Sequence, residues 1–243
     1  MNIITIEKVS KSFKIPHEKR NSVSERFIGF FSRKRMTYET ISVLKKIDLT
    51  IEEGDFVGII GRNGSGKSTL LKIITGVLVP DSGQIKVQKK ISPLLELGIG
   101  FNGELTAKEN IYLYGAILGL SRKEITTKFN DIIHFAEIEQ FVDTKVKYFS
   151  SGMYIRLAFA TAMQVDAPII IVDEVLAVGD FRFQDKCKEL FRNYKQQGKT
   201  IIYVSHDLPM MTEFCNKIIL MEKGEIIYSG SPEKVISYYL AQA

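Results

Sequence analysis

Three short apolar runs rich in Val and Ile punctuate the chain and predict buried strands. They read DFVGIIG, IIIV and IIYV and begin at residues 55, 169 and 201. Each run is followed at once by glycine or by polar side chains. Short, nearly continuous apolar runs of this kind are typical of parallel strands that are covered on both faces. The pattern therefore predicts a buried parallel sheet with polar groups at the strand ends.

Helical spacing of apolar residues occurs between and beyond these runs. The stretch STLLKIITG, residues 68–76, places its leucines and isoleucines on one helical face. Capping boxes that begin at Thr106 and Ser121 precede two further apolar periodic segments and predict two helices. The stretch IRLAFATAMQ predicts another helix. Pro232, directly after a serine, favours a short helix near the end of the sequence.

Residues 61–69 read GRNGSGKST, which fits the P-loop pattern G-x-x-x-x-G-K-[ST] in the strand–loop–helix setting that the pattern requires. Glycines let the backbone N–H groups turn toward phosphate oxygens, and the helix adds the positive end of its dipole. Lys67 is expected to reach the β and γ phosphates and Ser68 to ligate Mg²⁺. A glycine turn without a ligand is the alternative, which the flanking pattern disfavours. The expected ATP-binding residues of the loop are Gly61, Arg62, Asn63, Gly64, Ser65, Gly66, Lys67, Ser68 and Thr69.

Ionisable side chains follow the other two apolar runs. Asp173 and Glu174 follow the second run, and His206 follows the third after one serine. In a P-loop protein, a carboxylate at such a strand end holds Mg²⁺ through water, which suits Asp173. Glu174 is placed to polarise the attacking water as a general base. His206 is predicted to contact the γ-phosphate, because its strand end lies beside the other two; a lone histidine is more often structural.

A second helix start with phosphate-binding character lies at residues 149–153, FSSGM. Ser150, Ser151 and Gly152 would present hydroxyl and N–H groups to an anion. A plain serine N-cap is the alternative. If this turn does not reach the nucleotide of its own chain, it can serve the nucleotide of a partner. Two-fold symmetry then places each of two ATP molecules between one P-loop and one opposing serine–glycine turn.

Composition narrows the class of protein only slightly. The 243 residues are 45% hydrophobic and 25% charged, as in an ordinary globular protein. No apolar run approaches the roughly 18 residues of a membrane-spanning helix, and the first residues do not resemble a signal peptide. Cys187 and Cys215 form no metal-like pair, which favours a reducing cytoplasm. The net charge of +5 allows nucleic acid or anionic lipid as a partner and selects neither.

The order of the motifs resembles that of ATP-binding-cassette (ABC) ATPases. GRNGSGKST, FSSGM, IIIVDE, LAVGD and VSHD are similar to the Walker A, signature, Walker B, D-loop and switch-histidine motifs of that family. The resemblance covers nearly the whole chain and implies a single α/β domain, residues 1–243. It implies a RecA-like P-loop core with an antiparallel β-subdomain in residues 1–95 and 165–243. Residues 104–164 are expected to form an α-helical subdomain that ends in the signature helix.

The resemblance also implies roles for individual residues in the hydrolysis of ATP with Mg²⁺. The implied residues are Lys67 at the γ-phosphate, Ser68 and Asp173 at Mg²⁺, Glu174 as the catalytic glutamate, His206 as the switch histidine, Asp180 in the D-loop, and Ser150, Ser151 and Gly152 toward the opposing ATP. Phe13, near the end of the first expected strand, fits the aromatic residue that stacks on adenine. Family members close two such cassettes face to face around ATP and part them after hydrolysis.

Two departures from the family pattern stand out. The usual signature is L-S-G-G-Q, whereas Ser151 and Met153 here replace its first glycine and its glutamine. The expected Q-loop glutamine is absent from LLELGIGFNGELT, where Glu96 is the predicted stand-in and Asn102 is the alternative. Because that position contacts Mg²⁺ or water, the replacement is expected to slow turnover.

The stretches FSSGMYIRLAFA, DEVLAVGD and LLELGIGF are together similar to the ATPase subunits that export lipid-linked cell-surface polysaccharides, such as O-antigen and teichoic acid. This resemblance implies a transmembrane permease subunit as partner and a homodimer of the ATPase subunit on ATP binding. It implies a peripheral location at the cytoplasmic face of the membrane, with membrane contact through the permease and no nucleic acid. Export of teichoic acid or capsule, a non-transport ABC ATPase that acts on nucleic acid, and a regulator that binds ATP without useful hydrolysis are the alternatives.

Residues 15–40 form an extra segment before the P-loop, and it carries six Lys or Arg against three Glu. A capping box at Ser22 and a stripe of Val23, Phe27, Phe30 and Phe31 predict a short basic amphipathic helix. Three uses remain open: packing on the β-subdomain of its own chain, contact with the transport subunit, and contact with anionic lipid. Nothing after the last expected helix resembles the sugar-binding domain that some members of the exporter group carry.

Overall fold

The structure is a computed structural model that describes residues 1–17, 37–94, 97–173 and 181–242. Within these residues the centre is a six-stranded sheet, in which all neighbours run parallel except the antiparallel pair β8–β9. The three apolar runs of the sequence form β3, β6 and β7, which confirms that prediction. In spatial order the strands are β5 (Ile91–Leu94), β6 (Ile169–Asp173), β7 (Thr200–Val204), β3 (Phe56–Ile60), β8 (Lys217–Glu222) and β9 (Glu225–Gly230).

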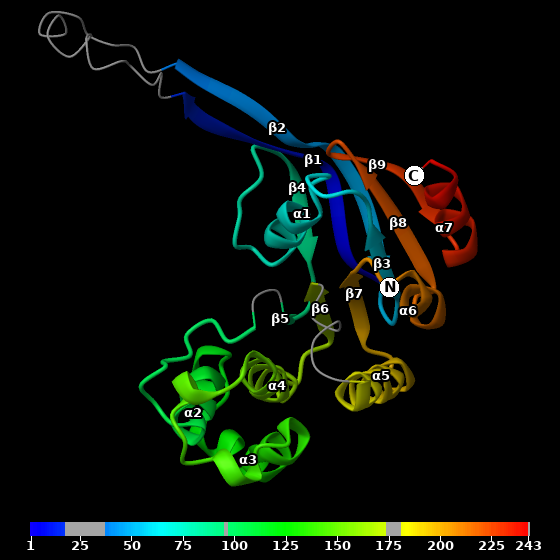
Figure 1. The fold of residues 1–243 in the computed structure, drawn as a ribbon. Coiled ribbons are helices and arrows are strands. Elements are labelled where there is room, and N and C mark those ends of the chain that lie inside the picture. Colours follow the sequence, from blue (N-terminus) through cyan, green and yellow to red (C-terminus); the bar gives the residue numbers. More distant parts are fainter. Residues whose placement is uncertain (18–36, 95–96, 174–180, 243) are drawn as a thin grey trace, which may run out of the picture.

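A second, antiparallel sheet consists of β2 (Thr37–Glu52), β1 (Asn2–His17) and β4 (Ser82–Val87), in that spatial order. The pairing of β1 with β4 ends at Ser10 and Ser82. Beyond that point β1 and β2 continue alone to the pair His17 and Thr37. Figure 1 shows this two-stranded ribbon projecting from the rest of the molecule.

Alternate residues of the central strands face two different hydrophobic clusters, as the period of two in a strand requires. Val57 and Ile59 of β3 face the cluster that includes α1 (Lys67–Ile74) and the three-stranded sheet. Phe56 and Ile60 face the opposite cluster, which includes residues of α5 (Phe181–Gln196), α6 (Leu208–Phe214) and α7 (Pro232–Ala241). Both faces of the sheet are therefore covered.

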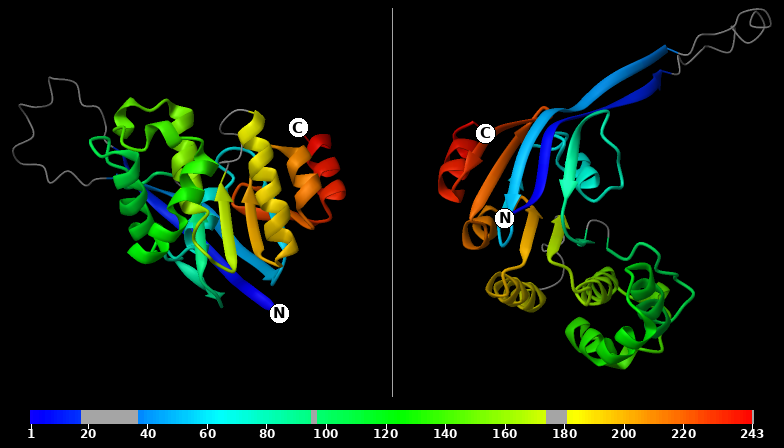
Figure 2. Two further views of the ribbon diagram at one scale, coloured as in Figure 1. Left: turned by 90° about the horizontal axis from the view of Figure 1, so that it is seen from below. Right: turned by 180° about the vertical axis from the view of Figure 1, so that it is seen from behind.

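Helices α2 (Ala107–Ile117), α3 (Arg122–Ala136) and α4 (Ser151–Ala162) gather at one end of the molecule, away from α7 (Figure 2). Both predicted capping boxes are present. The Thr106 and Ser121 hydroxyl oxygens accept hydrogen bonds from the N–H groups of the third helical residues, Glu109 and Glu124. The carboxylates of these glutamates in turn accept hydrogen bonds from the N–H groups of the two caps. The three helices share a hydrophobic cluster that includes Ile111, Ile125 and Leu157.

The predicted insertion at residues 15–40 overlaps the described strands at its two ends. Its first residues belong to β1 and its last to β2, because the ribbon continues to His17 and resumes at Thr37. The amphipathic helix expected inside it lies outside the described residues. Pro232 occupies the first turn of α7 as predicted, although Ser231 before it makes no side-chain capping hydrogen bond. Among the helices in the described ranges, none has the length and apolar character to cross a membrane.

Candidate functional site

The register of the central strands brings the P-loop and two strand ends to one edge of the sheet. Ile59 of β3 pairs with Val204 of β7, and Val204 pairs with Asp173 at the end of β6. Since these strands are parallel, the residues that follow them lie at the same carboxyl edge, where ligands bind in open α/β sheets. The P-loop follows Ile60, and His206 follows β7, so three of the predicted motifs meet there.

Two glycines allow the P-loop to lie close to the main chain of neighbouring strands. Gly61 has φ 148°, and a Cβ there would lie 2.2 Å from the carbonyl oxygen of Met221 in β8. Gly66 has φ 105°, and a Cβ there would lie 2.9 Å from the carbonyl oxygen of Val43 in β2. Any larger residue at either position would collide with backbone that has little freedom to move. The loop therefore fits between β2 and β8 only if residues 61 and 66 are glycine.

Lys67 is the first residue of α1, and its side chain folds along the loop. The side chain is nearly buried, with 7% of the residue exposed. Its Nζ donates hydrogen bonds to the carbonyl oxygens of Gly61 at 2.7 Å and Arg62 at 3.2 Å. The first turn of α1 holds no acidic residue. A cation and the positive end of a helix dipole therefore meet without a carboxylate from that turn, as a phosphate site requires.

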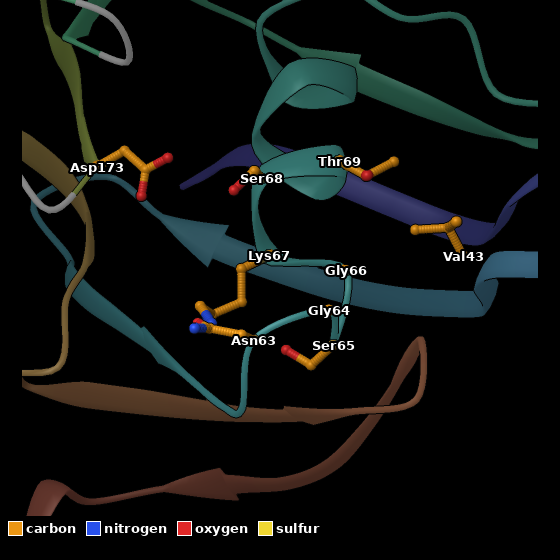
Figure 3. A pocket seen from close by; sticks show the side chains of 9 residues that line it. All are labelled: Val43, Asn63, Gly64, Ser65, Gly66, Lys67, Ser68, Thr69 and Asp173. Atoms are coloured by element: carbon orange, nitrogen blue, oxygen red, sulfur yellow. The ribbon is translucent and has the colours of Figure 1, made fainter.

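These groups surround a cavity of about 550 Å³ (Figure 3). Its lining combines backbone and side chains of the P-loop and α1 with one residue of β2 and the last residue of β6. The lining residues are Val43, Asn63, Gly64, Ser65, Gly66, Lys67, Ser68, Thr69 and Asp173. The Ser65 hydroxyl is buried and has no hydrogen-bond partner among the described residues. The cavity is therefore rich in donors for an anion.

Two oxygen-bearing side chains in the same cavity fit a magnesium ion. Figure 3 shows the Asp173 carboxylate and the Ser68 hydroxyl directed toward each other from β6 and α1. Mg²⁺ prefers oxygen ligands and is commonly held by one or two protein groups together with water and substrate phosphates. The donor set thus agrees with the roles predicted for Ser68 and Asp173.

Three expected nucleotide-binding residues, Phe13, Gly61 and Arg62, lie outside the cavity lining. Phe13 is 37% exposed on the ribbon, where it pairs with Ile41 and contacts the Lys11 ammonium. The Arg62 side chain is exposed and lines a separate pocket beside Tyr239 of α7. Conversely, Val43 lines the cavity and was missed by sequence reasoning, because its place depends on how β2 crosses the loop. A role for Phe13 at adenine stays a prediction.

Three further predicted residues, Glu96, Glu174 and Asp180, lie outside the described residues. His206 is exposed and follows the end of β7 by two residues, at the same edge of the sheet as Asp173. Asn102, the alternative to Glu96, belongs to a turn in which its side-chain oxygen accepts the N–H of Glu104 at 2.9 Å. It does not line the cavity.

The predicted signature turn forms the start of α4 and is not part of this cavity. Ser150 is the N-cap, and its hydroxyl accepts the N–H of Met153 at 3.2 Å. Ser150 and Ser151 are exposed and Gly152 is partly buried. In the isolated chain Ser150 is thus a serine N-cap, which was the alternative reading. The turn also remains accessible to another molecule.

Comparison with known proteins identifies the family. The sequence pattern described as "ABC transporter" matches residues 44–177. The chain is 43% identical to the O-antigen export system ATP-binding protein RfbB of Myxococcus xanthus, over 98% of this chain and 56% of that protein. It is 37% identical to the teichoic acids export ATP-binding protein TagH of Staphylococcus saprophyticus, over 98% of this chain and 89% of that protein. The chain spans less than two thirds of the two relatives matched at 43% and 45% identity.

Solved structures agree with the fold. The chain aligns with the dimeric ATP-binding cassette MJ0796 in a post-hydrolysis state bound to ADP and Pi, with a TM-score of 0.74 and 26% identity. That alignment covers 94% of this chain and 98% of the other. The α/β fold predicted from the motifs is therefore confirmed, as is the resemblance from which it was derived. The chain belongs to the ABC transporter family.

Proposed function

We propose that this chain is the ATP-hydrolysing subunit of an exporter that moves a lipid-linked cell-surface polysaccharide across the cytoplasmic membrane. The observation that carries the proposal is the meeting of Lys67, Ser68 and Asp173 in one cavity at the carboxyl edge of the sheet. The similarity to O-antigen and teichoic acid export ATP-binding proteins supports the cargo class. A permease subunit and a peripheral place at the cytoplasmic face of the membrane follow from this proposal.

The chemistry proposed is phosphoryl transfer from ATP to water. The Lys67 ammonium donates hydrogen bonds to two carbonyl oxygens of the loop in this structure. When ATP binds, it donates to the β and γ phosphates instead. Mg²⁺, held by Ser68 and Asp173, would neutralise charge on those phosphates. Glu174 orients the attacking water, and His206 contacts the γ-phosphate. Loop N–H groups stabilise the charge that develops in the transition state.

We further propose that the active form is a two-fold dimer, with Ser150, Ser151 and Gly152 of each chain at the ATP of the other. The exposure of the two serines, and the absence of all three residues from the cavity of their own chain, support this arrangement. The proposed homodimer also agrees with the dimeric cassette among the structural relatives. We also propose the division into residues 1–95 with 165–243 and residues 104–164, which the hydrophobic cluster shared by α2, α3 and α4 supports.

The test combines ATP turnover with oligomeric state. Glu174→Gln is expected to bind ATP, to stop hydrolysis and to elute as a dimer in light-scattering chromatography. Ser150→Ala in that background should weaken the dimer, whereas Ser121→Ala removes an equivalent serine N-cap in α3 and should not. A Glu174→Gln chain that stays monomeric with bound ATP would overturn the dimer. Hydrolysis that depends on DNA or RNA and on salt would instead favour a nucleic-acid ATPase.

A further inference from the structure

The loop between β5 and α2 contacts the first turn of α4 through an aromatic side chain, Tyr154. We propose that Tyr154 is a positioning residue, which couples this loop, residues 97–105, to the serine–glycine turn at Ser150–Gly152. The inference rests on the proposed function, since it assigns that turn to the ATP of a partner chain. It also explains why the first glycine of LGIGF, Gly98, stands at a position that the catalytic chemistry does not require.

Tyr154 is bonded to both of the segments that it would couple. Its backbone N–H donates to the carbonyl oxygen of Ser150 at 3.0 Å, within the first turn of α4. Its side-chain hydroxyl donates to the carbonyl oxygen of Gly98 at 3.1 Å. One residue thus connects the N-cap of the signature helix to the loop through two hydrogen bonds.

Ring packing fixes the position of the loop on Tyr154. The Phe101 ring lies 5.1 Å from the Tyr154 ring and 5.3 Å from the Tyr114 ring of α2, both in edge-to-face geometry. The N–H of Phe101 donates to the same Gly98 oxygen at 2.9 Å. Gly98 has φ 77°, and a Cβ there would lie 2.7 Å from Cε1 of Tyr154. Only glycine permits this close contact between the loop and the ring.

The far end of the loop is attached to α2 by a buried amide. Asn110 is fully buried, and its Oδ1 accepts the N–H of Asn102 at 2.7 Å. Its Nδ2 donates to the carbonyl oxygens of Asn102 at 3.0 Å and Leu105 at 3.1 Å. The loop is therefore fastened to α2 and α4 together. A displacement of its exposed tip at Ile99, which is 55% exposed, reaches Ser150 through Tyr154.

The test removes only the hydroxyl of the coupling residue. Tyr154→Phe keeps the ring and loses the bond to Gly98. Tyr112→Phe is the matched control, because its hydroxyl is bonded to Thr126 at 3.0 Å elsewhere in the same group of helices. In the Glu174→Gln background, Tyr154→Phe should weaken ATP-dependent dimerisation about fivefold, the effect of one hydrogen bond. In the active chain it should lower kcat to a similar extent, with ATP affinity of the monomer within twofold of wild type.

A second variant separates coupling from packing. Gly98→Ala should lower kcat more strongly, and the double variant Gly98→Ala with Tyr154→Phe should lose less than the product of the two single losses. Equal behaviour of Tyr154→Phe and Tyr112→Phe, in a wild type that hydrolyses ATP and dimerises, would overturn the role of Tyr154 alone. A loss of ATP affinity that matches the loss of kcat would also overturn it. A wild type that neither hydrolyses ATP nor dimerises would remove the proposed function and this inference together.

Discussion

Three glycines with the same left-handed backbone provide a graded test of the P-loop geometry. Gly76 after α1 and Gly64 in the loop have φ 77° and 79°, and a Cβ at either would meet no atom within 4 Å. Alanine in this conformation costs about 1–2 kcal/mol, offset by about 0.4–1 kcal/mol from the restricted unfolded chain. The expected net loss of about 0–1.6 kcal/mol corresponds to a Tm decrease of up to roughly 6 °C for each.

Gly66→Ala adds a collision to the same strain. Its Cβ would lie 2.9 Å from the backbone oxygen of Val43 and 2.8 Å from Cδ2 of Leu44, whose side chain is fully buried. Overpacking of this kind costs about 1–3 kcal/mol. If the loop relieves the collision by moving away from β2, ATP affinity falls by the same free energy, about 5- to 150-fold.

The assay for this series is thermal unfolding without nucleotide, together with titration of a fluorescent ATP analogue. Gly76→Ala should lose stability and keep ATP affinity within twofold, since it lies outside the cavity. Gly64→Ala should lose similar stability and show an intermediate affinity. Gly66→Ala should show the weakest binding of the three. Wild-type affinity in Gly66→Ala, or an equal loss of affinity in Gly76→Ala, would refute the assignment of this cavity as the nucleotide site.

Three further outcomes are expected. Phe191 is fully buried and contacts four other buried aromatic rings, so Phe191→Ala should cost about 3–5 kcal/mol in urea unfolding; Phe181→Ala, at an exposed site on the same helix, should stay within about 0.5 kcal/mol. Burial raises the pKa of Cys187 and Cys215 from 9.0 to about 12, so the thiols should resist iodoacetamide at pH 8 until the chain unfolds, and the stability they support should fall as the pH rises from 9 toward 12. Asp173→Asn should abolish Mg²⁺-dependent hydrolysis while ATP binding in EDTA is retained, and normal turnover would remove Asp173 from the metal site.

The parts of the site that could be predicted from the sequence are those specified by short, contiguous sequence motifs. The P-loop, its strand and its helix occupy one continuous stretch, and the glycine pattern follows from the backbone that the loop requires. Asp173 could be predicted because it ends an apolar run, and parallel strands of one sheet bring their carboxyl ends together. The capping boxes at Thr106 and Ser121 are equally local, since each spans one helical turn.

The parts that escaped prediction depend on segments far apart in the sequence. Val43 reaches the cavity only because β2 passes beside Gly66, and the sequence around Val43 contains no motif that indicates this contact. The hydrogen bond between Tyr154 and Gly98 joins residues 56 positions apart. The glycines of LGIGF therefore indicate only a turn as long as the position of α4 is unknown. The strands β1 and β2 also reach into residues 15–40, because they pair beyond the point where β4 ends.

The position of β3 in the sheet has a consequence for biosynthesis. Both of its neighbours, β7 and β8, come from the last quarter of the sequence, and its Phe56 N–H is bonded to the Asn216 side chain 160 residues later. At about 5–20 residues per second, translation leaves the P-loop strand without its native neighbours for roughly 8–32 s. A nascent chain in that interval carries the complete Walker A sequence, while the strand that precedes it lacks both of its neighbours. We therefore expect ATP capture on the ribosome to begin only after β7 and β8 have emerged.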